Sequence, residues 1–191
     1  MIRKALLVLF ITSTLFTSSL YCQKTGPHQI SRFADITAIE KEFTVGNVAA
    51  RMVEGLGFRY YWATQGLKKE DLNYRPSESG RTTFETIQHI HGLSEFMLSF
   101  LRESSVEVSD LDDSEKVRSA TLLNLERIEK KLTAMSAEDF ENYRAGEVTF
   151  WQFINGPVSD AIWHSGQVVM MRRASGNPIA EGVNVLMGKK R

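Results

Sequence analysis

The chain has 191 residues and a formal net charge of zero, with 23 Lys and Arg against 23 Asp and Glu. This length suits one domain with a proper hydrophobic core and is too short for two comfortable ones. The balanced charge, without a long basic run, argues against a nucleic-acid groove, so we expect no nucleic-acid partner.

The first residues, 1–22, have the layout of a secretory signal peptide. Arg3 and Lys4 precede a short apolar block, Ala5 to Ile11, and small and polar residues follow. The block is too short for a transmembrane helix, so the mature form is expected to have no such segment. Removing Arg3 and Lys4 from the 23 basic residues leaves 21 against 23 acidic ones, a net charge near −2. We therefore expect a secreted or periplasmic protein.

Cys22, the single cysteine, leaves two processing routes open. A lipoprotein would carry Cys22 as its first mature residue, normally with Leu or a similar residue three positions earlier and small residues between. Here Ser19 occupies that position, and the bulky Tyr21 directly precedes the cysteine. Cleavage before Gln23 is therefore favoured over lipid anchoring at Cys22.

After the signal segment the sequence divides into three parts. Residues 23–40 read as a loose lead-in, 41–179 as a helical domain and 180–191 as a C-terminal tail. The tail ends in three basic residues, Lys189 to Arg191, which are expected to be frayed and solvated.

Apolar residues at helical spacing predict four long helices, near 43–67, 83–103, 114–136 and 156–175. Between them, Lys68 to Gly80 reads as a loop and Ser136 to Phe153 as a longer connection. Gly55 and Gly57 in the first helix suggest close approach of a neighbouring element. There is no alternating strand pattern and no internal repeat, so the sequence predicts an all-α protein, a four-helix bundle.

The fourth predicted helix has clear boundary signals. Asn155 to Pro157 is a start signal, because proline is tolerated in the first turn. Arg172 and Arg173 suit the negative end of the helix dipole, Gly176 is a stop, and Pro178 prevents continuation.

The histidines can be sorted by helical geometry. Asp160 and His164 stand four residues apart in the fourth helix, so they point to the same side. His89, in the second helix, shares an apolar stripe with Leu93, Phe96 and Phe100. His91 lies about 200° away from His89, on a mostly polar edge, and is expected outside any cluster. His28 lies in the lead-in.

Two imidazoles and a carboxylate on facing helices match the ligands that borderline divalent cations need. We therefore predict a metal site formed by His89, Asp160 and His164. Gln167, one turn beyond His164, is placed to orient a ligand or a water. The alternative is a hydrogen-bonded polar set without a metal.

Other side chains are weaker candidates. Glu95 and Tyr61 are available for proton transfer, although a solvated edge and core packing explain them more simply. Trp62, Trp151 and Trp163 are candidates for a pocket mouth, with ordinary packing as the alternative.

Three stretches resemble the DinB-like (DinB/YfiT-type) family of metalloenzymes: ETIQHIHGLSE (85–95), FRYYWATQGL (58–67) and NGPVSDAIWHSGQVVMMRRASGNPI (155–179). The resemblance spans about 43–179 and is strongest in the last helix, where His-x-Gly-Gln precedes Arg-Arg and Gly-Asn-Pro. It implies a four-helix bundle that holds a divalent metal, often nickel or zinc, on three histidines. One comes from the second helix and two from a His-x-x-x-His pair on the fourth.

Carried over by position, these ligands fall on His89, Asp160 and His164. The aspartate departs from the triple-histidine pattern and gives a two-histidine, one-carboxylate site with open coordination positions. It favours manganese or iron, beside zinc and nickel, as the bound ion. The same departure also permits a degenerate site that binds no ion tightly.

Some DinB-like relatives are thiol transferases. The resemblance thus implies a secreted metal-dependent enzyme, in which a divalent metal activates water or a thiol for hydrolysis of, or transfer to, a small-molecule substrate. The predicted periplasmic location argues against a thiol transferase, because the usual thiol cosubstrates are cytosolic. The competing class is a non-catalytic helical bundle, with a homodimer as its possible form, whose polar triad is structural, metal-sequestering or degenerate.

Overall fold

The computed structural model describes residues 31–38 and 42–191, which are mostly helical, and this confirms the predicted all-α class. The predicted signal peptide, Cys22 and His28 lie outside the described residues. The elements are η1 (Ser31–Ala34), α2 (Val45–Thr64), α3 (Lys69–Asn73), α4 (Thr83–Phe100), α5 (Ser114–Thr133), α6 (Ala137–Asn142), α7 (Phe150–Phe153), η2 (Ile154–Val158), α8 (Ser159–Ala174), β1 (Val183–Asn184) and β2 (Lys189–Lys190).

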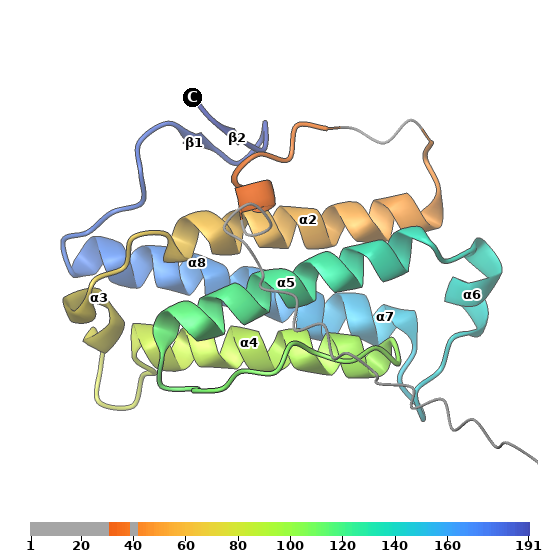
Figure 1. Cartoon of the computed structure of the whole chain (residues 1–191), viewed down its shortest axis with the longest axis horizontal. Coiled ribbons are helices and arrows are strands. Elements are labelled where there is room, and N and C mark those ends of the chain that lie inside the picture. The colour runs from red at the N-terminus through yellow and green to blue at the C-terminus, as the bar shows by residue number, and fades with distance from the viewer. Residues whose placement is uncertain (1–30, 39–41) are drawn as a thin grey trace, which may run out of the picture.

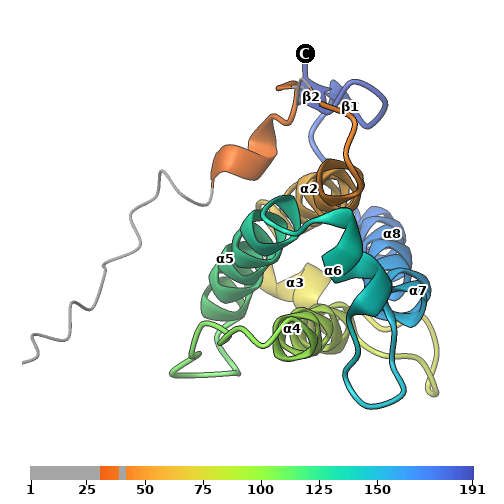
Figure 2. The same cartoon turned by 90° about the vertical axis from the view of Figure 1, so that its right-hand side faces the viewer.

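Four long helices, α2, α5, α4 and α8, lie side by side around a common core (Figures 1 and 2). Helices α2 and α4 each pack against both α5 and α8. The core between the helices is apolar, and its fully buried side chains include Leu56, Ile90, Leu125 and Val168. Within the described residues, no helix is long and apolar enough to span a membrane. The four predicted helices are thus present, while a bundle of the DinB/YfiT type stays a prediction.

Local capping explains where the long helices begin. At α4 the Thr82 hydroxyl accepts a hydrogen bond from the Glu85 backbone N–H at 3.0 Å. The Glu85 carboxylate in turn accepts one from the Thr82 backbone N–H at 2.7 Å. This reciprocal pair satisfies two N–H groups that the first turn leaves without helical partners. The side chains of Thr44 and Asp113 cap α2 and α5 by accepting hydrogen bonds from backbone N–H groups of the first turn.

Segments that the sequence presented as irregular contain short helices. The expected loop from Lys68 to Gly80 includes α3, and the connection from Ser136 to Phe153 includes α6 and α7. The side chains of Ser136 and Asp139 form a capping box at α6. Pieces of this length are fixed by such caps and by a few apolar contacts, so they lack the long periodicity from which the main helices were predicted.

Both segments next to the domain are ordered where the structure describes them. Phe33 of η1 is completely buried against α2, and the Ile36 backbone N–H donates to the Gly188 carbonyl at 2.8 Å. The tail forms the antiparallel pair β1–β2, with the Lys190 ammonium 5.5 Å from the centre of the Trp62 ring. The predictions of a loose lead-in and a frayed tail were therefore wrong for the described residues of these segments. The physical reason is that Phe33 and Ile36 bury apolar surface there.

We expect Gly57→Ala to destabilise the protein by about 1–3 kcal/mol, the usual cost of overpacking a core. A methyl group at Gly57 would collide with the Phe33 ring, so η1 would have to move. Gly92→Ala in α4 is the matched control, since a Cβ there meets nothing within 4 Å. That change should add about 1 kcal/mol through helix propensity. Urea unfolding of the three proteins measures both effects, and an equal stability gain in both variants would contradict the packing of η1.

Candidate metal centre

The helix that carries Asp160 and His164 begins earlier than predicted. Thr149 caps α7, and the Gln152 side chain accepts from the Thr149 backbone N–H at 3.0 Å. The chain then continues through the π-helical segment η2 into α8, with Pro157 inside the helix and not in its first turn. Asn155 to Pro157 was therefore wrong as a start signal.

The π-helical turn is a physical consequence of Pro157. In an α-helix its ring would collide with the carbonyl group four residues earlier, and its nitrogen has no hydrogen to donate. The wider turn relieves this conflict, and the Ser159 hydroxyl donates to the Ile154 carbonyl at 2.8 Å. Since η2 ends directly before α8, it sets the rotation of α8 about its axis and so the direction of the Asp160 side chain. Such π-turns occur frequently at functional sites.

The side chains of His89, Asp160 and His164 converge between α4 and α8. One candidate ligand atom from each residue lies within 4.8 Å of the other two. The two carboxylate oxygens of Asp160 face different rings: Oδ2 is 3.3 Å from His89 Nε2, and Oδ1 is 3.4 Å from His164 Nε2. The two rings meet edge to face, with centroids 4.6 Å apart. The predicted convergence of these three side chains is thus observed, and metal binding by them stays a prediction.

Gln167 orients His164. Its Oε1 atom lies 2.8 Å from His164 Nδ1, so this ring nitrogen donates to the amide oxygen. A neutral imidazole that carries its proton on Nδ1 has a free lone pair on Nε2, and this is the atom that faces Asp160. The side chain of His164 is 12% exposed, against 32% for His89 and 36% for Asp160. The centre is therefore held and shielded at His164 and more open at His89 and Asp160.

His91 lies outside this centre, as predicted, but it is not on a polar edge. Its side chain is buried, and Nδ1 lies 3.1 Å from the Thr121 hydroxyl of α5. Burial lowers the pKa of His91, and the nearby Glu95 carboxylate opposes this shift. The expected polar edge was wrong because α4 packs against both α5 and α8, so positions about 200° apart can each face a neighbouring helix.

Two hollows adjoin the centre, and Trp163 contributes to both. The larger, of about 780 Å³, reaches His164 and Gln167 from the side of the loop between α3 and α4. The smaller, of about 490 Å³, reaches Asp160 and is also lined by Phe96 and Pro157. The centre is therefore accessible to small molecules from two sides.

The side chains considered for proton transfer or for a pocket mouth are either exposed on the surface or packed against neighbouring side chains. Glu95 is half exposed, 3.6 Å from His91, which fits the solvated edge. Tyr61 lies under the Arg118 guanidinium, and Trp62 packs against Phe58 and Tyr61. Trp151 is exposed and lines a hollow at α6 and α7 that none of the three candidate ligands lines. Of the three tryptophans, only Trp163 lines a hollow beside the centre.

Comparisons of the chain with protein-family models, curated proteins and solved structures found no match. The resemblance to DinB-like proteins therefore stays an expectation from the quoted residues, and the case for a function depends on the geometry of the centre.

Gln167→Ala should weaken metal binding about tenfold, the lower end of what loss of a residue supporting a metal ligand costs. The variant frees the His164 ring to rotate and to carry its proton on either nitrogen. Gln152, an exposed glutamine that caps α7, provides the control, and Gln152→Ala should leave the affinity unchanged. Calorimetric titration with Zn²⁺ compares the two, and equal affinities would show that Gln167 does not support the ligand.

Proposed function

We propose that this chain is a secreted, metal-dependent enzyme with a four-helix bundle of the DinB/YfiT type. In this proposal His89, Asp160 and His164 hold a divalent ion, and the substrate is a small molecule. The observation that carries it is the convergence of two imidazole nitrogens and a carboxylate within 4.8 Å, in a centre that two hollows reach.

The donor set fits a borderline divalent cation. Imidazole nitrogen and carboxylate oxygen are ligands of zinc, manganese, iron and nickel, and bonds to zinc of about 2.0–2.2 Å require only small movements of these side chains. Three protein ligands leave coordination positions open, whereas structural zinc sites close with four. When bound, such an ion would supply Lewis acidity that activates water or a thiol at neutral pH.

The protein's own residues divide the remaining work. Gln167 holds the His164 ring with Nε2 toward the centre, and Asp160 supplies the only negative charge among the three candidate ligands. Trp163 lines both hollows, so it bounds the space in which a substrate can approach. Substrate would therefore enter beside α8 and meet the centre from the exposed side of Asp160.

A second candidate is a non-catalytic polar triad. Its support is that Asp160 already lies 3.3 and 3.4 Å from the two imidazoles, so a protonated histidine could form a hydrogen-bonded set without an ion. This alternative predicts that purified protein contains no stoichiometric metal.

Titration calorimetry with Zn²⁺, Ni²⁺, Mn²⁺ and Fe²⁺ tests the metal centre. Since loss of a supporting residue costs about 10–100-fold, His164→Ala should weaken the best-bound ion by about 100-fold or more. Asp160→Ala should weaken it as well, whereas Asp160→His should retain binding because it supplies a nitrogen ligand. Glu95→Ala, an exposed carboxylate on α4, is the control. Equal, weak affinity in wild type and all variants would reject the centre and the enzyme with it.

Cobalt substitution separates an open centre from a closed one. An open coordination position should accept a small thiol such as 2-mercaptoethanol, because thiolates are good ligands of such ions, and the visible absorption band of the Co²⁺ protein should then change. An unchanged band with tightly bound cobalt would indicate a metal site without an open coordination position and would contradict the proposed enzyme.

A further inference from the structure

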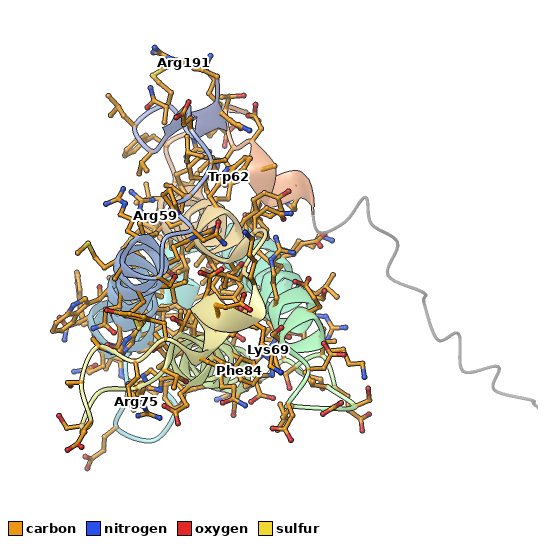
Figure 3. All side chains as sticks on the ribbon, turned by 90° about the vertical axis from the view of Figure 1, so that its left-hand side faces the viewer. Arg59, Trp62, Lys69, Arg75, Phe84 and Arg191 are labelled. Carbon is orange, nitrogen blue, oxygen red and sulfur yellow. The ribbon has the colours of Figure 1, made fainter. Side chains whose placement is uncertain are left out.

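The larger hollow beside the candidate metal centre has the size and lining of a ligand site. Its volume of about 780 Å³ lies within the range of about 300–1,000 Å³ that small-molecule pockets occupy. Three parts of the chain line it: the loop before α4, the first turn of α4, and α8. Figure 3 views this end of the molecule, and the loop that carries the labelled Arg75 extends there beside α4 and α8.

The charge in this hollow comes from Arg81. The side chain is exposed, and no hydrogen bond or ion pair to it is found within residues 31–38 and 42–191. Its neighbour Arg75 differs, because that guanidinium pairs with Glu85 and with the Gly80 carbonyl. No acidic side chain of the described residues lines the hollow. A positive charge without a partner among the described residues therefore lines the hollow.

The loop that presents Arg81 is held in place. The Gly80 backbone N–H donates to the Ser77 carbonyl at 3.1 Å, and the Thr83 N–H donates to the Tyr74 carbonyl at 3.0 Å. Arg81 directly precedes Thr82, the N-cap of α4, whose backbone N–H is bonded to the Glu85 carboxylate. An anionic group here would therefore meet the Arg81 guanidinium.

The α8 side of the hollow carries two exposed apolar side chains. Trp163 and Met170, seven residues apart on α8, therefore point to nearly the same side, and they are 71% and 63% exposed. A large aromatic side chain exposed beside a polar centre is a typical surface for a flat apolar ligand. His164 and Gln167 lie on the same wall, so a ligand on Trp163 reaches the centre.

We propose that this hollow binds a small organic carboxylate with a flat apolar group. The carboxylate pairs with Arg81, the apolar group lies on Trp163 and Met170, and the remaining end of the molecule faces His164. The end of the ligand that faces His164 would react only at a bound metal ion, so this part of the inference rests on the proposed function. The anion-binding part depends only on the hollow.

Phenylacetate and its neutral isostere phenylacetamide are the probes. Both are titrated calorimetrically into the full chain with a chelator present, so that the carboxylate cannot coordinate a metal. Wild type should bind phenylacetate about fivefold tighter than phenylacetamide, the discrimination expected from one exposed ion pair. Arg81→Gln should abolish this preference, and Trp163→Ala should weaken both probes alike.

Arg173→Gln is the matched control, since Arg173 is exposed on α8 and lines a different hollow. It should keep the preference for phenylacetate, and circular dichroism should show that all variants are folded. Equal binding of the two probes by wild type, or an undiminished preference in Arg81→Gln, would overturn the carboxylate site.

The same proteins separate this inference from the proposed function. If zinc binds as expected but wild type does not discriminate between the probes, the carboxylate site fails and the metal centre stands. If the Arg81-dependent preference is present but His164→Ala leaves zinc affinity unchanged, the metal centre fails and the anion site stands.

Discussion

Arg172→Ala is expected to lower the free energy of unfolding by about 4 kcal/mol, within the range for removing one partner of a buried charged network. The guanidinium is buried, and its Nη1 lies 2.9–3.2 Å from the backbone carbonyls of Trp62, Ala63 and Gln65. These carbonyls belong to the end of α2, where helical partners are missing. For a chain of this length the loss corresponds to about 12 °C in melting temperature.

Arg173→Ala is the control for this prediction. Arg173 follows directly in α8 but is exposed, and substitutions at such positions usually change stability by less than about 0.5 kcal/mol. Arg172→Lys should fall between the two, because one ammonium group cannot make the same set of bonds. Thermal and urea unfolding measure all three, and equal stability of the two alanine variants would contradict the role given to Arg172.

This contact changes how the most specific stretch of the sequence is understood. Arg172 was expected to suit the dipole of its own helix, but it caps the neighbouring α2 and also donates from Nε to the Asn177 carbonyl at 2.7 Å. The Asn177 side chain in turn donates to the Gly66 carbonyl at 3.0 Å. Part of the pattern that resembles DinB-like proteins therefore ties α8 to α2. His164 lies two turns earlier on α8. The same contacts therefore fix the position of His164, and of the candidate metal centre, along α2.

The long helices could be predicted because each one has apolar residues at helical spacing over many turns. The predicted range 114–136 corresponds to α5 at Ser114–Thr133, and 83–103 corresponds to α4 at Thr83–Phe100. Periodicity does not describe a helix with a π-turn, so Pro157 was taken as a start when it lies inside. It also does not identify Phe33, whose burial depends on a contact with the distant Gly57.

The candidate centre was predictable in part for the same reason. Asp160 and His164 are four residues apart on one helix, so their proximity follows from local geometry. His89 required a guess about which face of α4 meets α8, and the apolar stripe gave the correct residue with an incomplete reason. His91 is the more buried histidine, but it faces α5. Burial alone would thus have selected the wrong imidazole. Arg81 carried no signal in the sequence, because its proposed role depends on a loop folding beside α8.

Asp71 in α3 should make stability depend on pH below neutrality. Its carboxylate is buried and accepts hydrogen bonds from the Ser175 hydroxyl, the Asn177 side chain and the Lys68 backbone N–H. Burial alone would raise the pKa of Asp71, but these hydrogen bonds and the nearby charge of Arg172 hold it below its ordinary value. The carboxylate thus links α3 to the end of α8.

The direction of the effect follows from the lowered pKa. In the unfolded chain the Asp71 carboxylate takes up a proton near pH 3.9, whereas in the folded protein it does so only at lower pH. The stabilisation by Asp71 is therefore complete well above pH 3.9 and is lost as the pH falls through the folded pKa. At pH 7, Asp71→Asn should cost about 3 kcal/mol, because the amide group turns a donor toward groups that also donate.

Unfolding by urea at a series of pH values from 7 to 3 measures this contribution. The stability difference between wild type and Asp71→Asn should shrink as the pH falls, because protonation makes the wild-type carboxyl resemble the amide. Asp139 provides the comparison, since it caps α6 through similar local contacts but is exposed. Within the described residues its carboxylate accepts hydrogen bonds from Ser136 alone. Asp139→Asn should have a much smaller effect at every pH. A difference for Asp71→Asn that stays constant down to pH 3 would show that its loss comes from packing and not from the charge that fastens α8 to α3.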